Sequence, residues 1–327
     1  MASCRGGLLL SSTTTSVIKE IVIVMGYNAA GKSTLVQQFT LRNYHRLNRD
    51  LEGGGLDDLA VKADHLLKGG VNTIVLDNTY PTAKSRASIV KVAKYHRVPI
   101  RCLWLTTSFE DAQLNACLRM VRDTGKLLQP EDFKKTKNPN HFPPVALFAY
   151  KKEFQKPTVA EGFSSVESVE FKRTWGKEYV NKALILDYDG TLRLSKGVQK
   201  YPIELRDIDL MPNRTERLKE FQKKGYKLLG ASNQSGIGKG SVKHEQVVAC
   251  FEETNRQLGL KIEYSFCPHR IPPVSCYCRK PHPGMGAVFI ETHKLNPADC
   301  IMVGDMTTDE TFAKRCGFQY VDVNKFF

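Results

Sequence analysis

A glycine-rich stretch near the start of the chain restricts what the N-terminal half can fold into. The run Ile21–Met25 is short, apolar and rich in β-branched residues, which is typical of a buried strand. The sequence GYNAAGKST follows directly over residues 26–34 and has the pattern G-x-x-x-x-G-K-S. A strand, a glycine-rich loop and a helix start in this order are the context that the pattern requires. The stretch therefore predicts an α/β unit.

The residues of this loop also predict phosphate binding. Gly26 and Gly31 allow the backbone to curl around a phosphate, and amide groups at the helix start face its oxygens. Lys32 supplies a positive charge, and the hydroxyl of Ser33 can reach Mg²⁺. Together with Thr34, these residues are the candidate binding site for ATP or another nucleoside triphosphate.

Two acidic residues are expected at strand ends of the same unit. Asp50 ends the segment after the predicted helix, and the strand-like run Thr73–Leu76 ends in Asp77. The segment Leu56–Leu67 between them is predicted to be a helix, as in a βαβ unit. A carboxylate beside a phosphate loop can take the proton of an attacking hydroxyl. Asp50 is therefore a candidate base, and the alternative is that it caps a helix.

A second apolar run that ends in acids lies in the C-terminal half. The stretch LILDYDGTL, residues 184–192, predicts a strand that ends in Asp187 and Asp189. Open α/β sheets build their sites at the carboxyl ends of such strands. One carboxylate can attack phosphorus while the other protonates the leaving oxygen. The alternative is an acidic turn that caps a helix.

Further residues at fitting spacings support phosphoryl chemistry there. A strand over 227–231 leads to Ser232 and Asn233, whose hydroxyl and amide can bind a phosphoryl oxygen. Lys280 supplies a cation, and Asp305 follows another predicted strand. An anionic nucleophile attacking an anionic phosphate needs a divalent cation and a lysine to offset repulsion. The role of Asp309 stays open between a carboxylate behind the metal ligands and an acidic helix start.

Four soft ligands lie close together between these features. Cys267, His269, Cys276 and Cys278 fall within twelve residues. Three thiolates and one imidazole fit a closed tetrahedral Zn²⁺ site, which leaves no open position and is therefore predicted to be structural. The alternatives are an adventitious cysteine cluster and a disulfide, which a reducing compartment disfavours.

Length and charge bound the domain count and the partners. With 327 residues and 41% hydrophobic content, the chain can form two domains of ordinary size. Lys and Arg number 48 against 34 Asp and Glu, and the net charge of +14 favours polyanionic partners. The alternative is charge that serves solubility alone. No window reaches the ~18 apolar residues of a membrane span, so no membrane partner is expected.

The chain is predicted to have three parts. Residues 1–17 are expected to be a flexible leader, residues 18–172 the first domain and residues 173–327 the second. Both domains are expected to be doubly wound α/β folds. No signal sequence is present, so the expected location is a reducing intracellular compartment, cytoplasm or nucleus, and not the secretory route. The oligomeric state stays open.

The order of motifs in the N-terminal half resembles the kinase domain of the polynucleotide 5′-kinase/3′-phosphatase family. The shared features are the phosphate loop, NRD at 48–50, DNT-x-P at 77–81 followed by Ser85-Arg86, and the ending PTVAEGF at 157–163. The resemblance implies that Asp50 is the general base for a 5′-hydroxyl. It also implies that Arg119, in a mobile lid, stabilises the transferring phosphoryl group, and that Asn78 and Arg86 line the acceptor groove.

The chain departs from this family at several positions. Gly53 and Cys117 stand where some members of the family carry arginine. Arg122 either compensates in the lid or is a solvated helix residue. The loop 129–145, with three lysines, His141 and Phe142, is either a surface that contacts a nucleic-acid strand or a solvated lid loop.

The motifs of the C-terminal half resemble the haloacid dehalogenase superfamily of phosphatases. The resemblance implies that Asp187 is the nucleophile, that Asp189 is the acid and base, and that Ser232 and Lys280 hold the phosphoryl group. It implies that Mg²⁺ is bound by Asp187, Asp189 and Asp305. The Cys/His loop resembles the zinc loop of histidinol-phosphate and heptose-bisphosphate phosphatases.

Together these features predict an enzyme that heals nucleic-acid ends. It would phosphorylate 5′-OH ends and remove 3′-phosphates from DNA or RNA, with a ligase as a candidate partner. The main alternative is a small-metabolite kinase fused to a histidinol- or sugar-phosphate phosphatase. A nucleotide-controlled binding module with decayed catalysis is disfavoured because both catalytic sets are intact.

Overall fold

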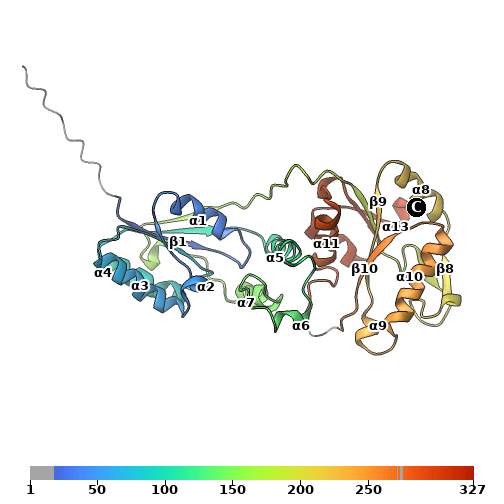
Figure 1. Ribbon diagram of the computed structural model, residues 1–327, viewed down its shortest axis with the longest axis horizontal. Coiled ribbons are helices and arrows are strands. Elements are labelled where there is room, and N and C mark those ends of the chain that lie inside the picture. Colours follow the sequence, from blue (N-terminus) through green and yellow to red (C-terminus); the bar gives the residue numbers. More distant parts are fainter. Residues whose placement is uncertain (1–17, 271, 273–274) are drawn as a thin grey trace, which may run out of the picture. The chain divides into compact units, whose positions relative to one another are not determined.

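The computed structural model describes residues 18–270, 272 and 275–327, so the predicted leader over residues 1–17 lies outside the described residues. The described chain forms two compact units, each with a five-stranded sheet (Figure 1). Of the described residues, those from 18 to 25, Lys32–Trp104 and Gln155–Ser168 form the first unit, and those of Gly26–Gly31, Leu105–Phe154 and Val169–Phe327 form the second.

The first sheet is centred on the strand that precedes the phosphate loop. Its strand order is β2-β3-β1-β4-β5, and β1 pairs in parallel with β3 and β4. The five residues Ile21–Met25 are fully buried, as expected for a strand covered on both faces. The strands are β1 (Glu20–Met25), β2 (His45–Leu47), β3 (Thr73–Asp77), β4 (Ile100–Leu105) and β5 (Ser165–Val169). The helices are α1 (Lys32–Thr40), α2 (Arg49–Glu52), α3 (Leu56–Lys68) and α4 (Ala83–Tyr95), with a 3-10 turn at Val159–Glu161.

The second sheet is centred on the strand that precedes the two aspartates. Its order is β10-β9-β6-β11-β12, and β6 pairs in parallel with β9 and β11. All four residues of β6 are buried. The strands are β6 (Ala183–Leu186), β9 (Lys227–Asn233), β10 (Glu263–Cys267), β11 (Ile301–Gly304) and β12 (Gln319–Asp322). An antiparallel pair, β7 (Arg193–Ser195) and β8 (Ile208–Leu210), follows β6 in the chain.

The described chain of the second unit also forms helices. They are α5 (Phe109–Thr124), α6 (Pro130–Phe133), α7 (Val145–Glu153), α8 (Arg214–Lys223), α9 (Ser235–Gly238), α10 (His244–Leu258), α11 (Gly284–His293), α12 (Thr307–Cys316) and α13 (Val323–Phe326), with 3-10 turns at Leu205–Asp207 and Pro297–Asp299. The predicted α/β class is confirmed. Within the described residues, no helix combines the length and the apolar content needed to cross a membrane.

The compact units do not follow the division at residue 172 that the sequence predicts. Helix α5 packs closely against α11, and one hydrophobic core holds buried residues of both. Leu118 and Met120 of α5 share that core with Phe289 of α11 and Phe312 of α12. Residues 105–154, predicted to belong to the first domain, therefore pack with the second.

Candidate active sites

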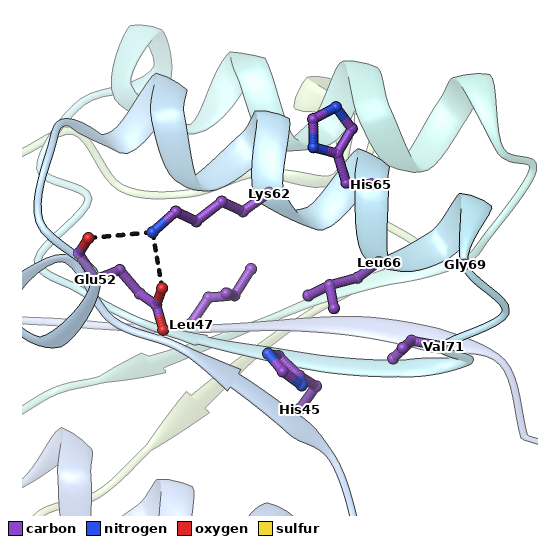
Figure 2. A pocket seen from close by; sticks show the side chains of 8 residues that line it. All are labelled: His45, Leu47, Glu52, Lys62, His65, Leu66, Gly69 and Val71. Atoms are coloured by element: carbon purple, nitrogen blue, oxygen red, sulfur yellow. Dashed lines mark hydrogen bonds and ion pairs between the residues drawn. The ribbon is translucent and has the colours of Figure 1, made fainter.

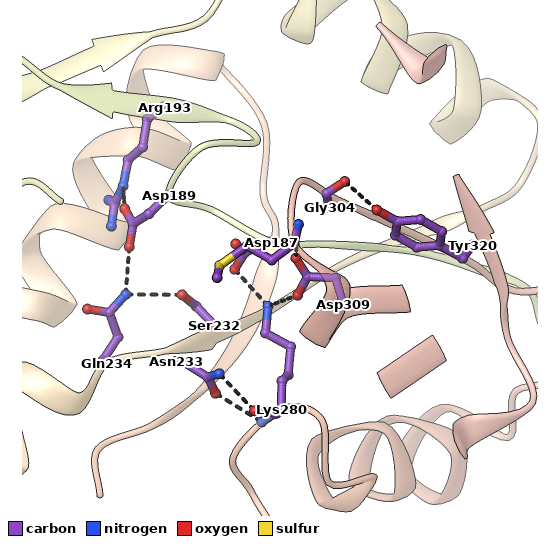
Figure 3. A network of polar contacts seen from close by, with 11 residues as sticks. Asp187, Asp189, Arg193, Ser232, Asn233, Gln234, Lys280, Gly304, Asp309 and Tyr320 are labelled. Carbon is purple, nitrogen blue, oxygen red and sulfur yellow. Dashed lines mark hydrogen bonds and ion pairs between the residues drawn. The ribbon is translucent and has the colours of Figure 1, made fainter. Parts of the chain in front are cut away.

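The carboxyl end of β6 brings Asp187 and Lys280 together. The Asp187 amide donates to the Val303 carbonyl of β11 (3.0 Å), which fixes the backbone directly after β6. Lys280 Nζ lies 2.8 Å from Asp187 Oδ1 and 2.6 Å from Asp309 Oδ1 (Figure 3). All three side chains are buried, so the lysine charge is shared between two carboxylates away from water.

Burial and neighbouring charges change the proton affinities of this group. Burial raises the pKa of Asp187 to about 6, and the negative charge of Asp309 adds to the rise while Lys280 opposes it. Burial lowers the pKa of Lys280, but the charges of Asp187 and Asp309 outweigh that effect and the net shift is upward. Lys280 therefore stays charged. Its single positive charge does not neutralise both carboxylates that it contacts, Asp187 and Asp309.

The excess negative charge fits a divalent cation. Asp187, Asp305 and Asp309 each offer a carboxylate oxygen, and these atoms all lie within 4.8 Å of one another. Only one lysine offsets three acids, and hard oxygen ligands of this kind suit Mg²⁺. The predicted Mg²⁺ residues Asp187 and Asp305 therefore lie together. Asp309 joins them, so its position is that of a site residue rather than of a helix-start acid alone.

Asp189 lies outside this carboxylate cluster, which corrects the prediction that its side chain binds Mg²⁺. Its Oδ1 accepts a hydrogen bond from Arg193 Nε (2.9 Å) and its Oδ2 accepts one from Gln234 Nε2 (2.8 Å) (Figure 3). Because both oxygens are engaged by donors, the carboxylate is turned toward Arg193 and Gln234. The side chain of Asp189 therefore contacts Arg193 and Gln234 and is not part of the group formed by Asp187, Asp305 and Asp309.

Ser232 and Asn233 are the last two residues of β9, and their side chains make different contacts. Ser232 is buried, and its Oγ accepts from Gln234 Nε2 (3.0 Å) at the edge of the site. The Asn233 side chain accepts from the Lys280 amide (3.0 Å) and donates to the Lys280 carbonyl (3.0 Å). The Asn233 amide therefore holds the backbone of Lys280. Its predicted contact with substrate stays a prediction.

The Cys/His loop forms a compact cluster after β10. The sulfurs of Cys267 and Cys276 lie 3.7 Å apart, and His269 Nδ1 lies 3.5 Å from Cys267 Sγ and 3.2 Å from Cys278 Sγ. A tetrahedron with Zn–S of ~2.3 Å and Zn–N of ~2.0 Å has edges of roughly 3.5–3.8 Å. The four predicted ligand atoms, all within 4.8 Å of one another, therefore have the spacing of a tetrahedral site.

The phosphate loop has the backbone that its glycines permit. Gly26 and Gly31 have φ values of 150° and 95°, which L side chains rarely adopt. Helix α1 begins at Lys32, and Thr34 lies exposed in its first turn. The Ser33 hydroxyl donates to the buried Asp77 carboxylate (3.0 Å) at the end of β3. A hydroxyl beside a strand-end aspartate is the pair that holds Mg²⁺ in phosphate-loop proteins.

Helix α2 of the first unit carries Asp50. Asn48, not Asp50, caps the helix, because its Oδ1 accepts from the Asp50 amide (2.8 Å). Asn78 Oδ1 accepts from the Arg49 amide (3.0 Å), so Asn78 holds α2 in place. Asp50 keeps an exposed carboxylate, whereas Asn78 is buried and does not line a groove as predicted.

Arg86 is a structural residue, which corrects its prediction as a substrate contact. The side chain is 0% exposed, and its guanidinium makes a two-pronged ion pair with Glu161 (2.7 and 2.8 Å). It also donates to the Tyr80 carbonyl (3.0 Å). Every part of the side chain is thus committed to the interior, so it cannot reach a polynucleotide.

The lid residues lie in the second unit. Arg119 lies on α5 and donates to Asn140 Oδ1 (2.9 Å). Arg122 Nε pairs with the buried Glu291 of α11 (2.7 Å), so it is neither a lid residue nor merely solvated. In the loop 129–145, His141 and Phe142 are buried, which removes them from the proposed strand-contacting surface.

A pocket in the first unit holds none of the predicted site residues. It has a volume of about 420 Å³ and lies between β2 and α3 (Figure 2). Leu47 and Leu66 contribute apolar surface, and an ion pair between Lys62 and Glu52 (2.7 Å) crosses one end. Glu52 belongs to α2, so the pocket borders the helix that carries Asp50.

Comparisons with known proteins agree with the phosphatase geometry. Residues 182–327 match the family model described as polynucleotide kinase 3 phosphatase. This C-terminal part of the chain is therefore similar to that family. The matched range contains Asp187, Ser232, Lys280, Asp305 and the Cys/His cluster.

Similar curated proteins fall into two groups. A bifunctional polynucleotide phosphatase/kinase of Schizosaccharomyces pombe is 34% identical over 155 residues, 47% of this chain and 34% of that protein. The chain therefore spans about a third of the length of that relative. A D-glycero-beta-D-manno-heptose-1,7-bisphosphate 7-phosphatase of Haemophilus influenzae is 33% identical over 139 residues, 40% of this chain and 74% of that protein.

A solved chain of a Pnkp1/Rnl/Hen1 complex aligns over nearly the whole chain. The alignment covers 95% of this chain and 98% of that one, with 16% identity and a TM-score of 0.33. At this TM-score, the alignment does not establish a shared arrangement of the domains.

Sequence reasoning assigned no role to Gln234 and Arg193, and it left the roles of Asp309 and Asp77 open. Gln234 and Arg193 give no signal beyond standing near predicted motifs. Asp309 follows Asp305 by four residues, which is one helical turn and a usable signal. Asp77 was placed at a strand end, where its pairing with Ser33 follows from the parallel neighbours β1 and β3.

Proposed function

We propose that the chain heals nucleic-acid ends, phosphorylating 5′-OH ends with ATP and removing 3′-phosphates through an aspartyl-phosphate. The observation that carries the proposal is the contact of the buried Asp187 with Lys280, whose Nζ lies 2.8 Å from Asp187 Oδ1. Asp189 supplies a second carboxyl group two residues further along the chain. The phosphate loop with Ser33 on Asp77 supports the kinase half. The net charge of +14 supports a polyanionic substrate, DNA or RNA.

In the phosphatase reaction, Asp187 attacks phosphorus and Lys280 balances charge on the phosphoryl oxygens. Ser232, whose hydroxyl faces Gln234, binds one of those oxygens. Asp189 protonates the leaving 3′-oxygen and then takes a proton from the water that releases phosphate. Mg²⁺ held by Asp187, Asp305 and Asp309 supplies charge that offsets repulsion between nucleophile and phosphate.

In the kinase reaction, the loop from Gly26 to Thr34 binds the donor phosphates. Ser33 and Asp77 would hold Mg²⁺, which neutralises charge between the phosphates. Asp50, exposed on α2, takes the proton of the attacking 5′-hydroxyl. Arg119 is proposed to stabilise the transferring group, as the resemblance implies.

The expected result with an oligonucleotide carrying a 5′-OH and a 3′-phosphate is a new 5′-phosphate and released inorganic phosphate. The measurement uses ATP, Mg²⁺ and a radiolabelled γ-phosphate, with single- and double-stranded DNA and RNA in parallel. Histidinol phosphate and heptose 1,7-bisphosphate serve as comparison substrates. Turnover of these metabolites without any change at the oligonucleotide ends would favour a small-metabolite enzyme and refute end healing.

We further propose that Cys267, His269, Cys276 and Cys278 bind a structural Zn²⁺. The tetrahedral spacing of the ligand atoms supports it. Bound Zn²⁺ would anchor the segment that leads directly into Lys280. Elemental analysis of undialysed protein is expected to find about one zinc per chain, and Cys276→Ser is expected to lower both zinc content and melting temperature. A zinc content below about half an equivalent in folded protein would contradict the site.

The chain is proposed to act in a reducing intracellular compartment. All eight cysteines among the described residues are unpaired and buried, which supports that location. A ligase that joins the healed ends is the proposed partner, since the reaction produces the 5′-phosphate and 3′-hydroxyl that a ligase consumes.

A further inference from the structure

Arg193 is a buried arginine that no predicted motif uses. It lies on β7 and is 1% exposed. Its Nη1 donates to the Cys250 carbonyl (2.6 Å) and to Thr254 Oγ1 (2.7 Å), and its guanidinium lies 4.8 Å from the ring centre of Phe251. Burying an arginine is costly unless its donors are satisfied, so these contacts fix the side chain in one orientation.

Another donor of this fixed guanidinium, Nε, points at Asp189. Arg193 Nε lies 2.9 Å from Asp189 Oδ1. The other oxygen, Oδ2, accepts from Gln234 Nε2 (2.8 Å), and the same Nε2 lies 3.0 Å from Ser232 Oγ. Gln234 thus links Oδ2 to the residue proposed to bind a phosphoryl oxygen (Figure 3). Arg193 therefore holds one oxygen of Asp189, and Gln234 holds the other oxygen on the side of Ser232.

We propose that Arg193 is a positioning residue that orients Asp189 so that Oδ2 delivers the proton to the leaving oxygen. This inference rests on the proposed phosphatase function. In the first step, a bond forms between Asp187 and phosphorus, the bond from phosphorus to the 3′-oxygen breaks, and that oxygen takes the proton of Asp189. In the second step, water attacks phosphorus, Asp189 regains a proton, and inorganic phosphate leaves Asp187. Of the residues that react in this scheme, Arg193 contacts Asp189.

The orientation matters most when the leaving group is a poor one. The 3′-oxygen of a nucleotide leaves as a strongly basic alkoxide unless it is protonated, whereas p-nitrophenolate leaves without a proton. General acid catalysis contributes about 10²–10⁴-fold to a rate, and only the first substrate needs it. Loss of Arg193 is therefore expected to affect the two substrates unequally.

The test compares Arg193→Met and Arg193→Lys in the full chain on a 3′-phosphate oligonucleotide and on p-nitrophenyl phosphate. Arg193→Met is expected to lower kcat/KM, which reports transfer of the phosphoryl group to Asp187 and not the later hydrolysis, by about 10²-fold on the oligonucleotide and by less than about threefold on p-nitrophenyl phosphate. Arg193→Lys keeps the charge and is expected to recover part of the oligonucleotide rate. The control is Arg217→Met, since Arg217 also stacks on two rings, Phe221 and Phe326, without touching Asp189.

Equal losses on both substrates, or an unchanged oligonucleotide rate in folded Arg193→Met, would overturn the inference. If Arg193→Met does not fold, Arg193→Lys alone decides by the same comparison of leaving groups. The unsubstituted chain separates this inference from the proposed function. If it releases no phosphate from the oligonucleotide, the proposed function fails. If it is active and the variants lose both activities equally, only the role of Arg193 fails.

Discussion

Asp187→Asn is expected to abolish 3′-phosphate release while phosphorylation of 5′-OH ends stays near the unsubstituted rate. An amide cannot form the covalent bond to phosphorus, so the phosphatase rate should fall at least ~10³-fold. Asparagine has nearly the same shape, and Lys280 keeps its ion pair with Asp309 (2.6 Å). The fold should therefore survive. Release of phosphate and incorporation of radiolabel are measured on the same preparation.

The matched variant is Lys32→Ala, which removes the cation of the phosphate loop. It should lower phosphorylation of 5′-OH ends by a similar factor and leave 3′-phosphate release intact. The pair therefore tests two independent sites in one chain. Loss of both activities from either single substitution, with unchanged melting temperature, would show that the sites are not independent.

A fragment limited to residues 173–327 is expected to be insoluble or to lack a cooperative melt. Helix α5 covers α11 and shares one apolar core with it, so the cut exposes buried side chains such as Met285 and Phe289. It also strips Arg122 from the buried Glu291. Glu291 keeps its ion pair with Lys294 (3.1 Å) and its hydrogen bond from Tyr179 (2.7 Å), so the exposed apolar core is expected to account for most of the lost stability.

The contact of Gln113 with His282 adds to this expectation. Gln113 Nε2 lies 3.0 Å from His282 Nδ1, and both side chains are buried. Burial lowers the pKa of His282 to about 4, so the ring is neutral near pH 7 and accepts the hydrogen bond. His282 lies two residues after Lys280. Loss of α5 therefore removes support from the segment that carries the catalytic lysine.

Soluble yield, thermal melting and 3′-phosphate release of the fragment should be compared with those of the full chain carrying Lys32→Ala. That control lacks the kinase cation but keeps α5, so a difference is due to the missing helices rather than to missing kinase activity. A soluble fragment with a cooperative melt and the full phosphatase rate would contradict this account.

Sequence reasoning predicted the site residues that lie in motifs at the carboxyl ends of strands. Asp187 and Lys280 come together because β6 and the segment after the Cys/His loop meet at one edge of a parallel sheet. The Cys/His cluster could be predicted because the ligands are close in the sequence and their types suit one ion. The strand-end motif carried the information in the first case, and local spacing did so in the second.

The contacts that sequence reasoning did not predict join residues that are distant in the sequence. Arg86 and Glu161 are 75 residues apart, and Asn233 and Lys280 are 47 apart. No periodicity or spacing shows that such polar groups will satisfy each other inside the fold. The same reason hid the contact between Arg122 and Glu291, which are 169 residues apart.

Helix α5 also determines which part of the chain can be exchanged. Asn115 donates to the Ala29 carbonyl (2.9 Å) of the glycine-rich loop, and two residues earlier Gln113 reaches His282. A chimera joined at residue 172 would place a foreign phosphatase against this helix, with mismatched side chains on α11. A chimera that retains Leu105–Phe154 with the C-terminal part would preserve these contacts. The segment that can be transferred to another protein is therefore discontinuous in the gene.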